Sequence, residues 1–156
     1  MKLLVVSDTH GQNEILKELY KEYPSMDYYL HAGDSNTHEN ELLPFEAVQG
    51  NCDYFDFNQR RLIRTPIGNI LMKHHPYVTR NEIEDVKIFI HGHTHRYEID
   101  NSNGLIIMCP GSTSHPRDDS IGSYAIIEIE NNILDIKIIE LETKFTLKEY
   151  REVIKN

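Results

Sequence analysis

Short apolar runs recur along this chain, and a polar residue that could bind a metal ion follows most of them. In the first half of the chain, three such runs predict β-strands over residues 3–6, 27–31 and 45–49. A helix is predicted between the first two, over residues 14–23, with Asn13 as its cap and Pro24 after its end. Strand, crossover and strand in this order predict a parallel core sheet.

The second half of the chain is richer in predicted strands. They cover residues 61–64, 69–73, 86–90, 97–100, 105–108, 124–129 and 134–140, and turn sequences such as Asn-Ser-Asn-Gly join several of them. Thr146 and Glu149 form a capping-box pattern, which predicts a short C-terminal helix. Because no repeat or linker interrupts the chain, we expect one domain over residues 1–156, folded as a layered α/β sandwich.

Composition excludes some classes of function. The net charge of −9 argues against binding of long nucleic acid, which requires a basic face. The two cysteines lie far apart without a CxxC motif, so reduced thiols and a cytoplasmic location are expected. The apolar run at residues 3–6 is too short for a signal peptide, and no run is long enough to span a membrane.

Seven polar residues stand at the ends of the predicted strands: Asp8, His10, Asp34, Asn51, His74, His93 and His95. A lone aspartate there is usually a turn former, and a lone histidine is usually a packed or solvated residue. In open α/β sheets, however, ligands bind at the carboxyl ends of the strands. Seven such residues at one edge therefore predict a metal site.

The types of these side chains indicate the kind of metal. Oxygen and imidazole ligands without thiolate suit Mn, Fe, Zn, Ni or Co. Seven ligands are too many for one ion, so two divalent ions that share a carboxylate, about 3.5–4 Å apart, fit better. Glycines beside the candidates agree with this: Gly33 and Gly92 would let backbone approach the ions closely, and Gly50 would allow a tight turn.

Five short motifs resemble those of the calcineurin-like metallophosphoesterase superfamily: Asp8-Thr9-His10, Gly33-Asp34, Gly50-Asn51-Cys52-Asp53, the region of His74, and Gly92-His93-Thr94-His95. The chain is most similar to the small bacterial and archaeal phosphodiesterase branch, which also contains the retromer-scaffold subunit of eukaryotes. Cys109-Pro110-Gly111-Ser112 and Pro116-Arg117 extend the resemblance over nearly the whole chain. It implies an α/β/β/α sandwich of two mixed sheets with helices outside.

The resemblance also implies roles for single residues. Asp8, His10, Asp34 and His95 would hold one ion, and Asp34, Asn51, His74 and His93 the other, with Asp34 as the bridge. A hydroxide between the ions would attack phosphorus in line. Manganese is the expected metal, with Fe, Ni, Zn or Co as alternatives. The expected substrate is a small phosphoester, above all a diester, and cyclic or linear nucleotides are among the candidates. A homodimer is left open.

The chain departs from the family pattern in three places. Lys73-His74-His75-Pro76 stands where many relatives have Thr-His-Gly-His, so a register with His75 as the ligand is an alternative. Cys52 stands where larger phosphatases carry a histidine that could act as general acid. The proton would then come from His75 or His115, unless the leaving group needs none. The segment 78–85 is shorter than in most relatives, which usually have a helix there, and this predicts a more open cleft.

Other polar residues are expected either to support the metal site or to have no part in it. Asp53 and His31 are expected to orient ligands by hydrogen bonds. Arg117 could bind a substrate phosphate in bidentate fashion or be a solvated loop residue. His91 is expected on the opposite side of the Gly92 bend, His38 in solvent, and Cys52 in a structural role. The alternative function is a non-catalytic scaffold on the same fold. A metal sensor or store has no support beyond the ligands themselves.

Overall fold

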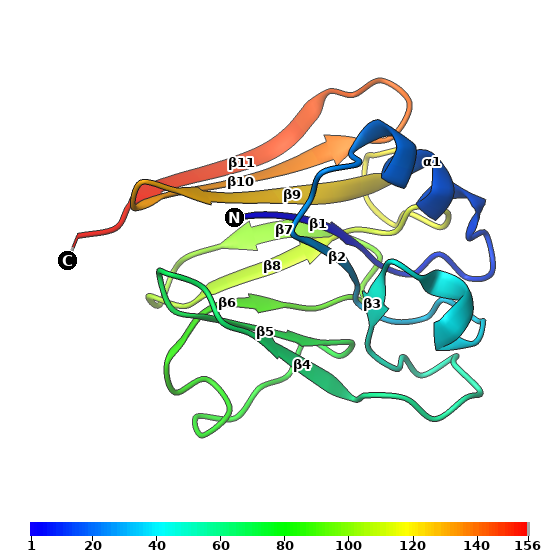
Figure 1. The fold of residues 1–156 in the computed structure, drawn as a ribbon, viewed down its shortest axis with the longest axis horizontal. Helices are drawn as coiled ribbons and strands as arrows, with labels where there is room; N and C mark the ends of the chain where they lie inside the picture. The colour runs from blue at the N-terminus through cyan, green and yellow to red at the C-terminus, as the bar shows by residue number, and fades with distance from the viewer. Residues whose placement is uncertain (156) are drawn as a thin grey trace.

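Two mixed β-sheets lie face to face in the computed structural model, which describes residues 1–155 (Figure 1). The first sheet has the order β11-β10-β9-β1-β2-β3. Its strands are β1 (Lys2–Val6), β2 (Tyr28–His31), β3 (Glu46–Ala47), β9 (Ser123–Glu130), β10 (Ile133–Glu140) and β11 (Thr146–Val153). β1, β2 and β3 run parallel, whereas β9, β10 and β11 form an antiparallel meander beside β1. The parallel core predicted from the first half of the chain is confirmed.

The second sheet has the order β4-β5-β6-β8-β7. Its strands are β4 (Arg60–Ile63), β5 (Asn69–Lys73), β6 (Val86–Ile90), β7 (Tyr97–Asp100) and β8 (Ile106–Pro110). The central strands β5, β6 and β8 are parallel, and the two edge strands are antiparallel to their neighbours. The expected sandwich of two mixed sheets is therefore confirmed.

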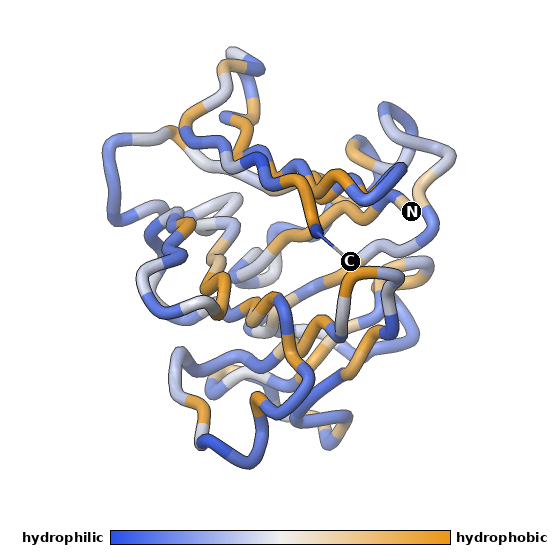
Figure 2. Tube along the Cα trace, turned by 90° about the vertical axis from the view of Figure 1, so that its left-hand side faces the viewer, coloured by the Kyte–Doolittle hydropathy of each residue, from blue (hydrophilic) through white to orange (hydrophobic). Residues whose placement is uncertain are grey.

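The alternation of side chains along β1 explains why the sheets stack. Leu3 and Val5 point into the core between the sheets, and Leu4 and Val6 point to the other face, where helix α1 packs. All four are fully buried, as expected for a strand that is covered on both faces. Figure 2 shows hydrophobic stretches along both layers and hydrophilic stretches in the outer loops.

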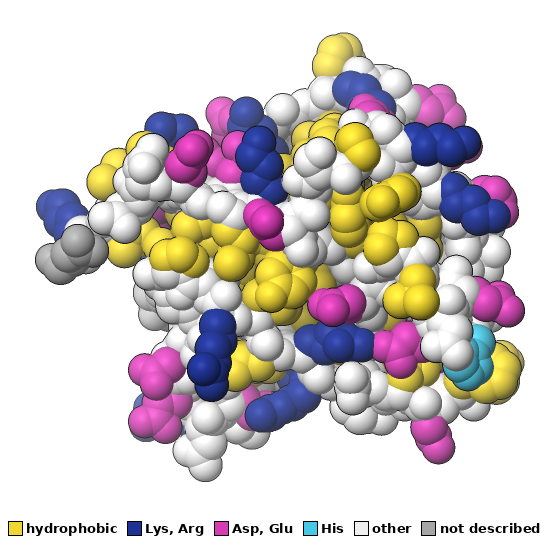
Figure 3. Space-filling view, in the orientation of Figure 1, with side chains coloured by type: hydrophobic (Ala, Val, Ile, Leu, Met, Phe, Trp, Pro, Cys, Tyr) yellow, Lys and Arg dark blue, Asp and Glu magenta, His cyan; other side chains and the backbone are white. Residues whose placement is uncertain are grey.

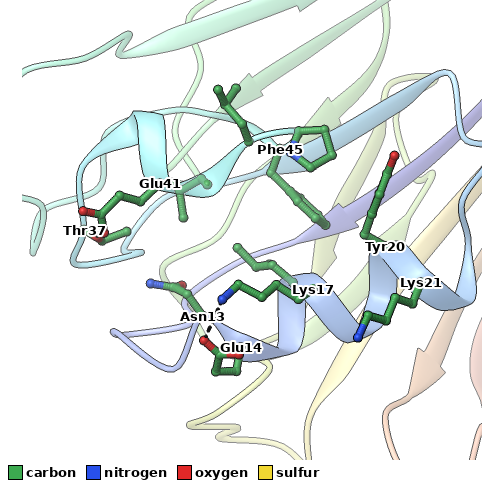
Figure 4. Close-up of a pocket in the computed structure, with 12 residues that line it drawn as sticks. Asn13, Glu14, Lys17, Tyr20, Lys21, Thr37, Glu41 and Phe45 are labelled. Carbon is green, nitrogen blue, oxygen red and sulfur yellow. Dashed lines mark hydrogen bonds and ion pairs between the residues drawn. The ribbon is translucent and has the colours of Figure 1, made fainter.

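The helices lie on the outer face of the first sheet. α1 (Glu14–Glu22) buries Leu16 and Leu19 there, and the short 3₁₀ helix η1 (Glu39–Leu42) buries Leu42. A groove of about 610 Å³ lies between them. Figure 4 shows Lys17 and Tyr20 of α1 on one side of it. Figure 3 shows hydrophobic side chains in the middle of the face seen in Figure 1 and hardly any histidine there, so the histidine-rich edge opens elsewhere.

The predicted C-terminal helix is wrong. Residues 146–153 form strand β11, which pairs with β10 and packs Leu147 and Tyr150 against the core. A helix of that length is marginal on its own, whereas the free edge of β10 offers partners for the backbone N–H and C=O groups. The local helix preference of the capping-box pattern is weaker than the pairing that the edge of β10 offers.

Asn13 does not cap α1, contrary to the prediction. It occupies the N-cap position, but its side chain makes no capping hydrogen bond. Its Nδ2 donates to Ser35 O at 3.0 Å, and its Oδ1 accepts from Thr9 Oγ1 at 2.5 Å. Asn13 therefore ties together the loops that follow β1 and β2.

The connection from β5 to β6 contains turns and no helix, as the short segment 78–85 predicted. Lys73 closes this connection, because its Nζ donates to Tyr77 O at 3.0 Å and to Glu82 Oε1 at 2.9 Å. The side of the second sheet near His75 is thus bordered by a loop that one lysine anchors.

Candidate metal centre

The seven predicted ligands meet where the carboxyl ends of the strands converge. Asp8 and His10 follow β1, Asp34 follows β2, and Asn51 lies in the loop after β3. From the second sheet, His74 follows β5, and His93 and His95 follow β6. Residues more than eighty positions apart are in contact, for example His10 Nε2 and His95 Nε2 at 3.2 Å.

One oxygen at the centre of the cluster has no hydrogen-bond donor. Asp8 is fully buried, and its Oδ2 accepts from Ser7 Oγ at 2.6 Å and from the His93 N–H at 3.0 Å. Its Oδ1 is buried and has no hydrogen-bond partner among the described residues. The Nε2 atoms of three imidazoles surround Oδ1: His95 at 3.3 Å, His10 at 3.7 Å and His74 at 4.0 Å. A buried carboxylate oxygen facing imidazole nitrogens fits a divalent cation.

Backbone carbonyls orient two of these imidazoles. His74 Nδ1 lies 2.8 Å from Ala32 O, and His95 Nδ1 lies 2.7 Å from His115 O. A carbonyl oxygen can only accept, so each Nδ1 carries a proton, and in the neutral ring each Nε2 presents its lone pair to the cluster. Such a hydrogen bond on the far nitrogen is typical of histidines that bind metals.

Asp34 lies between the two groups of histidines. Its Oδ2 is 3.3 Å from His74 Nε2 and 3.8 Å from His10 Nε2, and its Oδ1 accepts the Cys52 N–H at 2.8 Å. On one side of Asp34, ligand atoms of Asp8, His10 and His95 all lie within 4.8 Å of one another. On the other side, Asn51 Oδ1 is 2.9 Å from both His74 Nε2 and His93 Nδ1.

The backbone is strained at five of the seven positions. The φ angles of Asp8, His10, Asp34, His93 and His95 lie between 47° and 70°. Residues other than glycine rarely adopt this left-handed backbone region. Holding a residue there costs roughly 1–3 kcal/mol, and residues strained in this way are concentrated at functional sites. The fold thus holds these side chains in place at a cost to its own stability.

Asp53 fixes the loops that carry two of the candidates. Its carboxylate accepts the backbone N–H groups of Asp34 at 3.0 Å, Asn36 at 2.8 Å and Gly50 at 2.7 Å. The supporting role expected for Asp53 agrees with these contacts.

His31 is fully buried and links strand β2 to the loop after β1. Its Nδ1 accepts the Gly33 N–H at 3.1 Å, so its Nε2 carries the proton and donates to Thr9 Oγ1 at 2.9 Å. Thr9 in turn donates to Asn13. His31 therefore supports the backbone between Asp8 and His10 and is not itself among the facing ligands.

Two glycines make room for carboxylates. A Cβ on Gly92 would collide with Ser7 Oγ and the Asp8 carboxylate, and a Cβ on Gly50 would collide with the Asp34 carboxylate. Gly50 begins a turn, as expected, in which the Asp53 N–H donates to the Gly50 carbonyl at 3.3 Å, and it does so without a positive φ. Its lack of a side chain serves the close approach of Asp34.

The carboxylates of the cluster are anionic at neutral pH. Burial opposes ionisation of Asp8, but His95, His74 and Ser7 outweigh it and hold its pKa below the usual value. Burial likewise opposes ionisation of Asp34, yet His74 and the Cys52 N–H bring its pKa down to about 2. Burial lowers the pKa of His10, which favours the neutral imidazole that a metal ion requires.

This geometry agrees with a comparison against protein families. A family model described as "Calcineurin-like phosphoesterase superfamily domain" matches residues 1–132. The chain belongs to the calcineurin-like phosphoesterase superfamily. Membership implies divalent metal ions and supports a metal-dependent phosphoesterase.

Curated and solved relatives agree with this family. A probable metallophosphoesterase of Bacillus subtilis, YsnB, is 29% identical over 154 residues, which cover 90% of this chain and 91% of YsnB. A predicted phosphoesterase of Streptococcus pneumoniae has the same fold, with a TM-score of 0.78, 23% identity and 97% coverage of both chains. Vps29 of Entamoeba histolytica in complex with zinc has a TM-score of 0.73 and 23% identity, covering 97% of this chain and 98% of Vps29. At these identities the structural likenesses show the fold alone.

Three other residues of this phosphoesterase border the cluster. His75 is exposed, and its ring centroid lies 4.5 Å from that of His93. The imidazole that faces Asp34 and Asn51 is that of His74 and not that of His75. The ring of His115 lies 5.4 Å from that of His10. Arg117 is exposed and lines a hollow together with His10, His95 and His115.

His91 and Cys52 lie near the candidate ligands in the sequence, and each was given an interpretation that excludes metal binding. His91 turns away from the cluster as expected, with its Nε2 3.4 Å from Glu98. Cys52 lies closer to the site than a purely structural residue, because its Sγ and ligand atoms of His10 and Asp34 fall within 4.8 Å of one another. Burial and Asp34 raise the pKa of the Cys52 thiol, which opposes the thiolate form that binds metals.

Sequence reasoning missed the serines that support the cluster. Ser112 Oγ donates to Asp8 O at 2.7 Å, and Ser114 Oγ donates to Thr9 O at 2.9 Å. The only signal for them was the Cys-Pro-Gly-Ser stretch that carried part of the resemblance.

Among the described residues, no helix is long and apolar enough to cross a membrane.

Proposed function

We propose that this protein is a phosphodiesterase that uses two divalent transition ions held at the edge of its two sheets. The observation that carries the proposal is the buried Oδ1 of Asp8, which lacks a donor and faces three imidazole nitrogens. Such an oxygen would be costly in the folded protein unless a cation is bound beside it. Manganese is the first metal to test, with Zn, Fe, Ni and Co as the alternatives.

The ligands divide into two halves that share Asp34. Asp8, His10, Asp34 and His95 would hold the first ion, and Asp34, Asn51, His74 and His93 the second. Asp34 fits the bridge because its Oδ2 faces both His10 and His74. When bound, such a pair of ions lowers the pKa of a coordinated water and neutralises charge on the phosphoryl oxygens.

The other side chains would bind the substrate and move its proton. Arg117 lies beside the first half and can pair with a phosphate oxygen. His75 lies beside the second half and is the proposed proton donor to the leaving group, with His115 as the alternative. Burial, His74 and His93 lower the pKa of His75. Its protonated form, which is the proton donor, is therefore scarcer at a given pH than in a free histidine, and it declines further as the pH rises. Poor leaving groups should therefore be hydrolysed more slowly at alkaline pH.

A scaffold function is the alternative, and the likeness to Vps29 is its support. The complete set of seven facing ligands favours the enzyme, since a protein without catalysis has no need to hold five of them in strained backbone conformations.

Metal content and turnover together test the proposal. Protein stripped with chelator and reloaded with Mn²⁺ should contain two ions per chain and should hydrolyse bis-p-nitrophenyl phosphate. Two ions without turnover would favour the scaffold. One ion or fewer would overturn the two-metal model.

A further inference from the structure

A second hollow borders the half of the site that contains His74. It measures about 380 Å³ and is lined by His74, His75 and side chains from β4, β5 and the loops beside them. His74 Nε2 faces Asp34 and Asn51, so this hollow shares one candidate ligand, His74, with the proposed second metal position. The first half has a hollow of its own, where Arg117 lies. A hollow beside each half suits a substrate with two arms on one phosphorus, which is a diester.

The side chains in the second hollow differ in how far they are already engaged. Lys73 is occupied, because its Nζ is bound by Glu82 and by the Tyr77 carbonyl. Arg60 also lines the hollow, is exposed, and forms no ion pair or side-chain hydrogen bond within residues 1–155. Arg60 is therefore the cation that remains available to a ligand.

An aromatic ring and an amide are available beside Arg60. The side chain of Tyr77 is 75% exposed although it is large and mostly apolar. Gln59 donates its Nε2 to Gln49 Oε1 at 3.0 Å, and its own Oε1 accepts no hydrogen bond within the described part of the chain. Aromatic face, guanidinium and free amide oxygen together match a flat ring that carries hydrogen-bonding groups at its edge.

We propose that this hollow binds the nucleobase of a nucleotide diester, with the base on Tyr77 and Arg60 and its edge on Gln59. The inference rests on the proposed function, since the phosphorus of the same substrate would lie at the metal centre. A second phosphate fits the hollow less well, because Arg60 is the one unpaired cation among the described residues that line it. A base requires fewer charges and more flat surface, and the hollow offers both.

Equilibrium binding tests this without turnover. Zinc-loaded protein is titrated with adenosine 5′-monophosphate and with ribose 5-phosphate, which has the same sugar and phosphate but no base. Stacking of a base on an aromatic residue predicts that the nucleotide binds roughly tenfold more tightly. Tyr77→Ala and Arg60→Ala should each remove most of that difference and leave ribose 5-phosphate unchanged.

Two variants serve as matched controls. Tyr54 is another exposed tyrosine, 91% exposed, and Arg64 is another arginine near β4, yet neither lines this hollow. Tyr54→Ala and Arg64→Ala should keep the preference for the nucleotide. Equal binding of the two probes, or a preference that Tyr77→Ala and Arg60→Ala leave intact, overturns the inference.

Turnover separates this inference from the proposed function. Manganese-loaded protein should show a lower KM for thymidine 5′-monophosphate p-nitrophenyl ester than for bis-p-nitrophenyl phosphate, and Tyr77→Ala should remove the difference. Hydrolysis of both with equal KM keeps the phosphodiesterase and rejects the base-binding hollow. No hydrolysis of either rejects the phosphodiesterase, while the binding comparison still decides whether the hollow accepts a base.

Discussion

The buried carboxylate of Asp53 accepts the backbone N–H of Asp34 at 3.0 Å, although Asp53 does not face the proposed ions. The same carboxylate also accepts the N–H groups of Asn36 and Gly50. It thereby joins the loop that carries Asp34 to the loop that carries Asn51. An asparagine at position 53 would place N–H donors against N–H donors on one side of the group.

We therefore expect Asp53→Asn to weaken metal binding by roughly 10–100-fold, the usual effect of losing a group that orients ligands. The free energy of unfolding should also fall by about 1–3 kcal/mol, since buried N–H groups lose their acceptor. Competition with a chromogenic chelator and urea unfolding measure the two effects. Asp56→Asn is the control, because Asp56 is exposed in the same loop. Unchanged metal affinity in Asp53→Asn would show that the loops hold Asp34 without this carboxylate.

Asp34 is expected to be the most sensitive ligand. As the residue between His10 and His74, it would contact both ions, so Asp34→Asn weakens both positions and leaves two cations less screened from each other. Its kcat should fall further than that of His10→Ala, which removes a ligand of the first ion only. Rates on bis-p-nitrophenyl phosphate at saturating Mn²⁺ make the comparison. If Asp34→Asn turns over at the wild-type rate while His10→Ala is inactive, the bridge is assigned to the wrong residue.

The strands next to the site were predictable because each ends in a polar residue and a glycine or turn. Residues 69–73 and 86–90 were predicted with the boundaries that the structure has. The sequence could also assign Asp8 and His95 to one edge, since strand ends of parallel sheets converge. The C-terminal segment failed because local periodicity does not show a free sheet edge. Residues 146–153 read as a helix start, yet pairing with β10 decided their structure.

The supporting contacts were beyond sequence reasoning for a different reason. Ser112 reaches the carbonyl of Asp8 across 104 positions of sequence, and no local pattern marks such a partner. The role of Gly50 was also hidden, because the group that excludes a side chain there is Asp34, 16 residues earlier. Local sequence thus predicted which candidate ligands share one edge, and it did not show the contacts that orient them.

His31 should make the stability of the metal-free protein depend on pH. Burial brings its pKa down to about 4 from the ordinary histidine value of 6.5, so between these values the unfolded chain binds a proton that the folded chain does not. Stability is then highest above pH 6.5 and falls as the pH is lowered toward 4, by up to about 1.4 kcal/mol per pH unit.

Urea unfolding of metal-free protein at pH 7, 6 and 5 measures this dependence. His31→Gln should flatten it, whereas His38→Gln, which changes an exposed histidine, should leave it unchanged. Comparing each variant with the wild type cancels the contributions of the other histidines. Parallel curves for the wild type and His31→Gln would remove His31 as the cause.

The pair His74-His75 gives the most direct test of the proposed site. His74 is 2% exposed, and its Nε2 faces Asp34 and Asn51, so His74→Ala should lose the second ion and keep the first. His75 is exposed, lies outside that set of contacts, and should be dispensable for metal content. Elemental analysis of both variants after loading with Mn²⁺ decides the register. Loss of an ion from His75→Ala but not from His74→Ala would shift the ligand by one residue.

Rates on two kinds of ester then test the role of His75 as a proton donor. An alkyl phosphodiester has a poor leaving group that needs a proton, and His75→Ala should slow its hydrolysis by roughly 100-fold or more. Bis-p-nitrophenyl phosphate releases a stable anion and should be hydrolysed at nearly the wild-type rate. Because His115 lies beside the other half of the site, near His10, His115→Ala is the matched comparison. If His115→Ala shows the selective loss and His75→Ala does not, the proton comes from the first half of the centre. If neither variant distinguishes the two esters, the donor is water.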